Sequence, residues 1–224
     1  MKYFIANWKA RMHFDQISDW MKIFTEEVNQ NPQLLLKLAD NQIRIIICPP
    51  FPLLMQVKNN LPAVPNIFCG SQDLSQFDEG SYTGEVTTGS LTSLINYAII
   101  GHSERRKYFH ENDALLIKKF QMAKRYDIEP IYCIRNTTDT IPIDCKLIAY
   151  EPVSAIGTGQ NEALEKVIAV KHQLKLSSSQ IFIYGGSVDE KNAQEYLNSK
   201  EINGFLIGTA SLNPRQFYEI VKLG

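Results

Sequence analysis

Eight short apolar segments recur along the chain, and they constrain its fold more than any other feature. They are residues 3–6, 43–48, 67–69, 97–100, 131–134, 146–150, 181–184 and 205–207. Each is continuously apolar rather than alternating, which indicates strands covered on both faces of a parallel sheet. Helical patterns lie between most of them; the first places Ile17, Trp20, Met21, Phe24 and Val28 on one helical face.

Strand and helix patterns alternate eight times, and no Ser/Gly-rich linker or low-complexity tract divides the 224 residues. We therefore predict an α/β fold, a closed (β/α)8 barrel, in a single domain over residues 1–224. An open doubly wound sheet is the alternative. The last helix is predicted to begin at Asn213 and Pro214, which are typical of an N-cap and a first helical position.

Two segments depart from this rhythm. Residues 71–86 form a long polar stretch with neither strand nor helix periodicity, and such loops usually have a function. Residues 135–145 provide only eleven positions between the fifth and sixth strands, too few for a full crossover helix. We predict that this helix is reduced or absent, with Ile141 and Ile143 covering the barrel flank or the flank left thin.

Charge and cysteine usage exclude several classes of protein. The formal net charge is -1, so we expect neither a nucleic-acid partner nor an anionic membrane surface. The basic clusters at 105–107 and 118–125 are interpreted as solvated helix faces. The four cysteines form no C-x-x-C pair, which favours buried thiols over a metal site or disulfides. Residues 1–9 are too short and polar for a signal peptide, so we predict a cytoplasmic protein with no metal.

Polar residues follow three of the predicted strands. Asn7 and Lys9 follow the first, His102 the fourth and Glu151 the sixth. Each alone has an ordinary structural explanation: a turn amide, a surface cation, a structural histidine and a strand-end acid. In a barrel, however, these ends share one face. Together they would supply a general base, a hydrogen-bond donor and a positive charge, and a histidine at a helix start is favoured as the neutral ring.

Two glycine-rich turns follow the last two predicted strands. They are Gly185-Gly186-Ser187 and Gly208-Thr209-Ala210-Ser211. Backbone N–H groups at such turns, close to helix starts, favour phosphate binding. Their position after the seventh and eighth strands is where barrels often bind phosphate.

These motifs, taken together, resemble the triosephosphate isomerase family. The resemblance rests on Asn7-x-Lys9, on Gly101-His102-Ser103-Glu104-Arg105-Arg106, and on residues 150–153, 155–159 and 184–188, in an order that spans nearly the whole chain. It implies that Glu151 is the base, His102 the neutral electrophile, Lys9 the cation near the substrate oxygen and Asn7 a positioning amide. It places Gly157, Ser187, Gly208 and Thr209 at the substrate phosphate, with Glu104 paired to Lys9 and Ser103 in a supporting position.

The resemblance also implies a reaction and an assembly. The reaction is the interconversion of D-glyceraldehyde 3-phosphate and dihydroxyacetone phosphate in glycolysis and gluconeogenesis, through an enediolate and without a cofactor. The assembly is a homodimer in which Thr83 enters the neighbouring subunit's site. The chain departs from the family at Ser154, Thr209 and Arg135-Asn136. A barrel retained as a scaffold or adhesion protein, or a different phosphosugar enzyme, are the alternatives.

Overall fold

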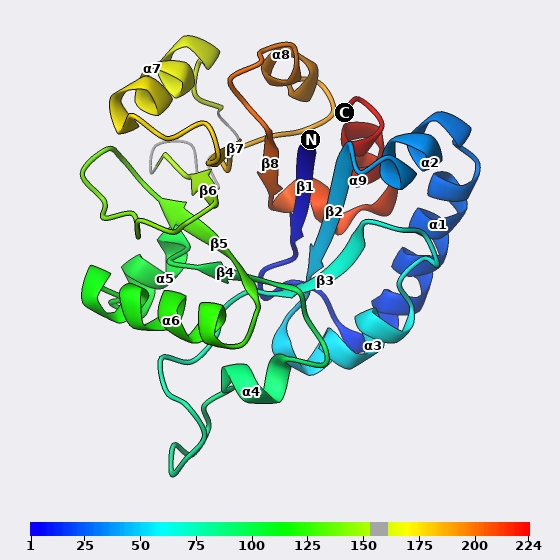
Figure 1. The fold of residues 1–224 in the computed structure, drawn as a ribbon. Helices are drawn as coiled ribbons and strands as arrows, with labels where there is room; N and C mark the ends of the chain where they lie inside the picture. Colours follow the sequence, from blue (N-terminus) through cyan, green and yellow to red (C-terminus); the bar gives the residue numbers. More distant parts are fainter. Residues whose placement is uncertain (153–160) are drawn as a thin grey trace.

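The protein, described here over residues 1–152 and 161–224 in a computed structural model, is a closed barrel of eight parallel strands surrounded by helices (Figure 1). The predicted (β/α)8 fold is therefore confirmed, and each apolar segment matches, contains or lies within a strand. The strands are β1 (Lys2–Asn7), β2 (Ile43–Cys48), β3 (Ile67–Ser71), β4 (Tyr97–Ile100), β5 (Glu129–Ile134), β6 (Leu147–Tyr150), β7 (Ile181–Tyr184) and β8 (Gly204–Ile207).

The helices between the strands vary widely in length. The described α-helices are α1 (Ile17–Asn29), α2 (Pro32–Ala39), α3 (Leu54–Asn59), α4 (Thr88–Leu91), α5 (Ser103–Tyr108), α6 (Asp113–Arg125), α7 (Leu164–Leu174), α8 (Ala193–Leu197) and α9 (Pro214–Val221). All five residues of the predicted apolar face of α1 are buried. As predicted, α9 begins at Pro214, and the Asn213 side chain caps it by accepting the N–H groups of Arg215 and Gln216.

The barrel closes where β8 pairs with β1, and a glycine makes this pairing possible. Tyr3 lies opposite Gly204 in the β1–β8 register. Gly204 has a φ of +132°, and a Cβ added there would lie 1.9 Å from the carbonyl oxygen of Tyr3. Any other residue would clash with the backbone of β1, so Gly204 is required for the closure.

The apolar side chains pack in two separate clusters, as continuously apolar strands require. Alternate residues such as Tyr3 and Ile5 of β1 point into the barrel, where they meet Cys133, Ala149 and other inward side chains. The residues between them, such as Phe4 and Ala6, belong to the larger cluster between strands and helices. All four cysteines are buried and free, in agreement with the sequence interpretation.

The connection between β5 and β6 contains no helix, which confirms the prediction (the light green loop in Figure 1). The expectation that two isoleucines cover this flank is half wrong. Ile141 is partly buried against the outer cluster, but Ile143 is 96% exposed. The wall is covered instead because Tyr132 of β5 packs edge-on against Phe120 of α6, with ring centroids 6.1 Å apart. A thin flank is therefore sealed by a neighbouring helix.

The segment between β3 and α4 is a long loop that projects from the barrel (Figure 1). Residues 80–85 are all exposed, including Thr83. The base of the loop is held where the N–H of Ser75 donates to the carbonyl of Val86 at 3.1 Å. Near its tip, Tyr82 stacks on Phe77 with ring centroids 4.1 Å apart.

Two residues of the basic clusters correct the sequence interpretation. Arg106 and Lys119 are buried, with 7% and 4% exposure, rather than part of solvated faces. The Lys119 ammonium contacts both carboxylate oxygens of Asp73, at 2.6 and 2.7 Å, and Glu111 Oε1 at 2.6 Å. Asp73 lies 46 residues from Lys119, and Arg106 also donates to the carbonyl of Cys133, 27 residues away, so a helical pattern alone could not reveal their burial.

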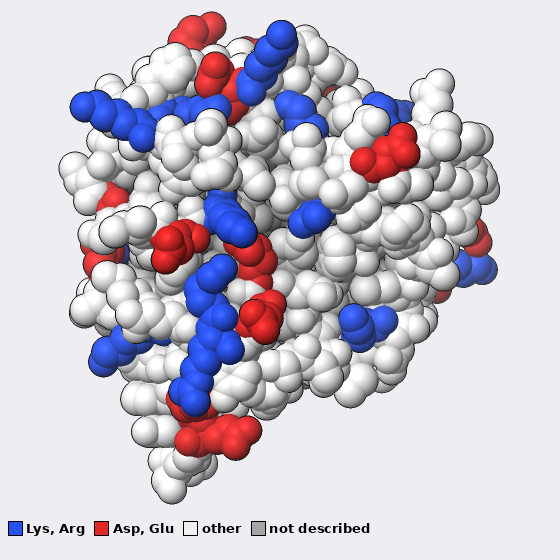
Figure 2. Space-filling view, in the orientation of Figure 1, with Lys and Arg blue, Asp and Glu red and all other residues white. Residues whose placement is uncertain are grey.

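The rest of the charged surface follows the expectation from net charge. Figure 2 shows Lys and Arg side chains interspersed with Asp and Glu on the face that it displays. Among the described helices, none is long and apolar enough to cross a membrane.

Candidate active site

The carboxyl end of β1 presents Asn7 and Lys9 to one end of the barrel. Asn7 is buried, and its Oδ1 accepts the backbone N–H of Lys9 at 3.1 Å. Lys9 has a φ of +52°, which is uncommon for a residue with a side chain. The side-chain amide of Gln72 holds this conformation by donating to the carbonyls of Lys9 and Cys48, both at 2.9 Å. Backbone strain of this kind clusters at functional sites.

The Lys9 ammonium points towards the start of α5. It donates to Glu104 Oε1 at 2.7 Å, the pairing that the resemblance implied. Burial alone would raise the pKa of Glu104, but the hydrogen bond from Lys9 and the nearby positive charges together outweigh burial, and the pKa is lowered. Lys9 therefore faces a charged carboxylate, which fixes the ammonium beside the cavity.

His102 caps α5 and faces Glu151. Its Nδ1 accepts the backbone N–H of Glu104 at 3.2 Å, and its Nε2 lies 2.8 Å from Glu151 Oε1. The other carboxylate oxygen of Glu151 accepts the backbone N–H of Ser103 at 2.9 Å. Both side chains are almost fully buried, with 7% and 1% exposure. The buried carboxylate of Glu151 is thus satisfied by two donors at the start of α5.

Two effects compete over the charge of His102. Burial of the imidazole lowers its pKa, but the carboxylates of Glu151 and Glu104 together outweigh burial, and the pKa is raised. The N–H that Nδ1 accepts from Glu104 requires an unprotonated Nδ1, so the proton shared with Glu151 is on Nε2. The ring therefore presents an Nε2–H donor to the cavity.

A cavity of about 580 Å³ brings the strand ends together. It is lined by Asn7, Lys9, His102, Glu104 and Glu151, and also by Gly185, Gly186, Ser187, Gly208 and Thr209. The residues that sequence reasoning selected from five different strand ends thus share one cavity. Ser103 does not line the cavity, but its backbone N–H donates to the Glu151 carboxylate.

Small residues let the turns approach the charged side chains. A Cβ added at Gly185 would lie 2.9 Å from Cγ of Glu151, and one at Gly208 would lie 3.3 Å from Cε of Lys9. Thr209 begins a short 3-10 helix over Thr209–Leu212. Side chains larger than hydrogen at the two glycines would push the base and the cation away from the cavity.

Some expected residues lie elsewhere. Thr83 sits on the projecting loop and does not line this cavity. Gly157 and Ser154 lie outside the described residues. Sequence reasoning missed Arg11, which lines the cavity two residues beyond Lys9, and Gln72, which holds Lys9. The spacing from Lys9 could have indicated Arg11, whereas no local pattern marks Gln72. Within residues 1–152 and 161–224, no group of three His, Cys, Asp or Glu is arranged to hold a metal ion.

The fold and the cavity define a class of protein. A carboxylate, an imidazole N–H and an ammonium converge at the carboxyl ends of parallel barrel strands, beside two glycine turns. This is where barrel enzymes place their active sites, with catalytic side chains taken from several strands. The molecule is therefore a (β/α)8-barrel enzyme.

Comparison with known proteins identifies the family. The chain belongs to the triosephosphate isomerase family, a family of isomerases, whose model matches residues 2–142 and 139–224. It is 34% identical to the triosephosphate isomerase of Dictyoglomus thermophilum, over 99% of this chain and 98% of that protein. It is likewise 34% identical to that of Mycoplasmopsis agalactiae, over 100% of this chain and 97% of the relative. The two matched segments overlap at residues 139–142, inside the short β5–β6 connection.

Proposed function

We propose that this protein interconverts D-glyceraldehyde 3-phosphate and dihydroxyacetone phosphate in glycolysis and gluconeogenesis. One observation carries the proposal. The Glu151 carboxylate, the Nε2–H of His102 and the Lys9 ammonium face one cavity, which glycine turns also line. An aldose–ketose isomerisation needs a base for the carbon next to a carbonyl and donors for the oxygen that becomes negative.

Glu151 is the base in this proposal. Its carboxylate removes a proton from the carbon adjacent to the carbonyl, and the C–H electron pair becomes the double bond of an enediolate. The same carboxyl then returns the proton to the neighbouring carbon while the hydroxyl proton passes from one substrate oxygen to the other, so the net change interconverts ketose and aldose. The backbone N–H of Ser103 and the Nε2–H of His102 hold the carboxylate until substrate arrives.

His102 and Lys9 stabilise the developing negative oxygen. The substrate oxygen takes the place of Glu151 Oε1 as the acceptor of the His102 Nε2–H. A neutral imidazole suits this role because Nδ1 is occupied by the N–H of Glu104 and cannot carry a second proton. Lys9 adds a positive charge, and Asn7 Oδ1 maintains the backbone of Lys9. Oriented donors of this kind are often the largest contribution to a rate enhancement.

The substrate phosphate is proposed to bind at Ser187, Gly208 and Thr209, together with Gly157 from outside the described residues. The first three line the cavity. Backbone N–H groups at such turns carry no net charge, so they bind phosphate without disturbing the base. Arg11 and Lys191, which also line the cavity, add positive charge near its mouth.

A homodimer completes the proposed enzyme. The exposed loop tip carries Thr83, which in this proposal reaches the partner's cavity. Exposed apolar side chains support such an interface: Phe14 is 69% and Met55 is 55% exposed. Gln56, the residue after Met55, donates its side-chain amide to the carbonyl of Phe14, so the segments that carry Phe14 and Met55 lie close together. We further propose a single-domain, cytoplasmic protein, since strands from both ends of the chain close one barrel and all four thiols are buried.

An isomerase assay on the purified protein tests the proposal. Each triose phosphate is supplied in turn, and the other is detected by a coupled dehydrogenase, with Glu151→Gln as the matched control. Turnover in both directions that the Glu151→Gln control lacks is the expected result. A folded but inactive wild type would favour the scaffold or adhesion alternative, and turnover of another phosphosugar alone would favour a different barrel enzyme.

A further inference from the structure

Three tyrosine hydroxyls converge on Asn161 and Glu162, just after the undescribed residues 153–160. Tyr150 donates to Glu162 Oε2 at 2.8 Å, and the backbone N–H of Glu162 donates to the Tyr184 hydroxyl at 2.8 Å. The Tyr196 hydroxyl donates to the carbonyl of Glu162 and accepts from the side-chain amide of Asn161 at 2.7 Å. Glu162 is therefore bonded through its side chain and both of its backbone groups.

The three tyrosines are a rigid set. Tyr184 and Tyr196 are fully buried, and their rings stack with centroids 4.8 Å apart. Tyr150 is 5% exposed, and its ring stacks on Phe182 at 6.1 Å. Burial and the bond to Glu162 both raise the pKa of Tyr150, so its hydroxyl stays protonated and remains a donor. A buried hydroxyl needs such an acceptor, and Glu162 supplies it.

These tyrosines stand next to residues of the active site. Tyr150 directly precedes Glu151 at the end of β6, and Tyr184 directly precedes Gly185 at the end of β7. The two ends are joined, because the N–H of Gly185 donates to the carbonyl of Tyr150 at 2.7 Å. A Cβ at Gly185 would touch the Glu151 side chain. A small shift of the Tyr150 ring would therefore move the base.

We propose that Glu162 is a positioning residue for Glu151. Its carboxylate fixes the Tyr150 hydroxyl, and through it the end of β6, so that the Glu151 carboxylate meets the reacting carbon at the right distance. Glu162 itself lines no part of the cavity and touches no reacting group. This role rests on the proposed function, because it assumes that Glu151 is the base.

The bond between Glu162 and Tyr150 is the part that distinguishes this role from simple anchoring. The backbone bonds of Glu162 to Tyr184 and Tyr196 would survive replacement of its side chain and keep the segment in place. Only the side-chain hydrogen bond joins Glu162 to Tyr150, the residue before Glu151. A variant that lacks this bond alone therefore tests positioning without removing the backbone anchors.

The test is a double-mutant cycle on Glu162→Ala and Tyr150→Phe, with Glu162→Gln as the conservative variant. Each single change is expected to lower kcat about 10- to 100-fold, the range for a misplaced base, with little change in KM. The double variant should be no slower than the worse single one, because both remove the same bond. Glu162→Gln should remain near wild type, since its amide oxygen still accepts the hydroxyl.

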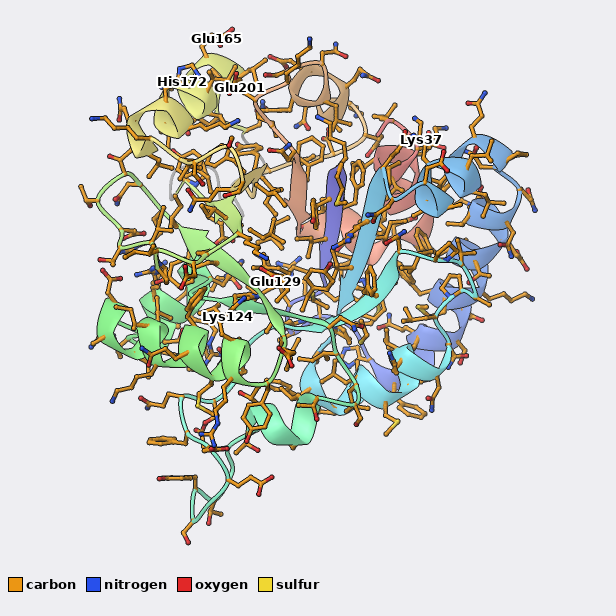
Figure 3. The ribbon with its side chains drawn as sticks, viewed as in Figure 1. Lys37, Lys124, Glu129, Glu165, His172 and Glu201 are labelled. Carbon is orange, nitrogen blue, oxygen red and sulfur yellow. The ribbon has the colours of Figure 1, made fainter. Side chains whose placement is uncertain are left out.

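Matched controls use exposed residues of the same types. Glu165→Ala removes a glutamate at the outer side of α7, three residues away (Figure 3), and Tyr108→Phe removes a hydroxyl from a side chain that is 63% exposed. Both should keep wild-type kcat. If the fold-losses in kcat of the two single variants multiplied in the double variant, the proposal would be overturned. A lower Tm with unchanged kcat would also overturn it and would leave Glu162 as an anchor of the segment.

A second readout separates this proposal from the proposed reaction. The His102 Nε2 proton lies in a 2.8 Å contact with Glu151, so its NMR resonance reports where the carboxylate sits. Glu162→Ala and Tyr150→Phe should shift that resonance by the same amount, and Glu165→Ala should not. An unshifted resonance refutes positioning even in an active enzyme. A shifted resonance in a protein without isomerase activity supports positioning while the proposed reaction fails.

Discussion

The carboxylate of Glu151 accepts the backbone N–H of Ser103 at 2.9 Å, across 48 residues of sequence. This bond, together with the contact to His102, holds the base against the start of α5 rather than in the open cavity. A carboxylate with 1% exposure would be costly without these donors. Both carboxylate oxygens of Glu151 therefore have a hydrogen-bond donor, and in the proposed reaction the substrate has to replace one of these partners.

Shortening the base tests its placement. Glu151→Asp retracts the carboxylate by about 1 Å, a misplacement that can cost roughly a hundredfold in rate. We expect kcat to fall by about that factor while Tm changes little. Steady-state kinetics in both directions would measure it. Wild-type kcat with unchanged KM would show that Glu151 is not the base.

The charge of His102 depends on Glu151. Burial lowers the pKa of the imidazole, and the neighbouring carboxylates, Glu151 first and then Glu104, together raise it by more. Glu151→Gln removes the negative charge and keeps an oxygen, so the pKa of His102 should fall and the ring should stay neutral over a wider pH range. NMR titration of the His102 ring protons in both proteins would measure the shift. An equal or higher pKa in the variant would contradict this account of the pair.

Assembly is tested at the tip of the projecting loop. Thr83→Arg would bring a second cation towards the partner's Lys9, so it should weaken the dimer and lower activity together. Light scattering and activity measured over the same concentrations give both quantities. Ser178→Arg, at another exposed position, is the control. A wild-type protein that is active yet monomeric at micromolar concentration would rule the dimer out.

The short β5–β6 connection is stabilised by Asp139. This side chain is 4% exposed and accepts from Arg135 three times, at 2.7, 3.0 and 2.7 Å. Burial alone would raise the pKa of Asp139, but the bonds from Arg135 outweigh it and the pKa is lowered. Its stabilising contribution is therefore complete above the unfolded-state pKa of about 3.9 and is lost as the pH falls through the lower folded-state value.

Asp139→Asn should cost about 1–3 kcal/mol at pH 7, the range for hydrogen bonds to charged groups. The difference in Tm from wild type should narrow at pH 3, because the unfolded-state carboxyl is then protonated and folding has to ionise it. Thermal unfolding across pH 3–7 measures both effects. Asp144→Asn, an exposed change in the same connection, should leave Tm nearly unaltered at every pH. A Tm difference that stayed constant with pH would exclude the ionic explanation.

The strands and the candidate site residues could be predicted from local sequence patterns. The long-range hydrogen bonds that hold these residues in place could not. Continuous apolar runs located all eight strands because both faces of a barrel wall are buried. Asn7, His102 and Glu151 could be selected because barrel topology brings strand ends together. Gln72 and Glu162 could not, because each acts through a partner on another element. Lys119 was misjudged for the same reason: its burial depends on Asp73, which is 46 residues away.

The absence of a helix between β5 and β6 also means that the chain can be opened there. Ile143 and Asp144 are exposed, and the strands on either side are paired in register without the connection. The two ends of the chain lie near each other in Figure 1, with Gly224 packed against Phe4 of β1. A circular permutant that joins Gly224 to Met1 through a short linker and starts at Asp144 should therefore fold into the same barrel. The positions of the two chain ends would then be one choice among at least two for this barrel.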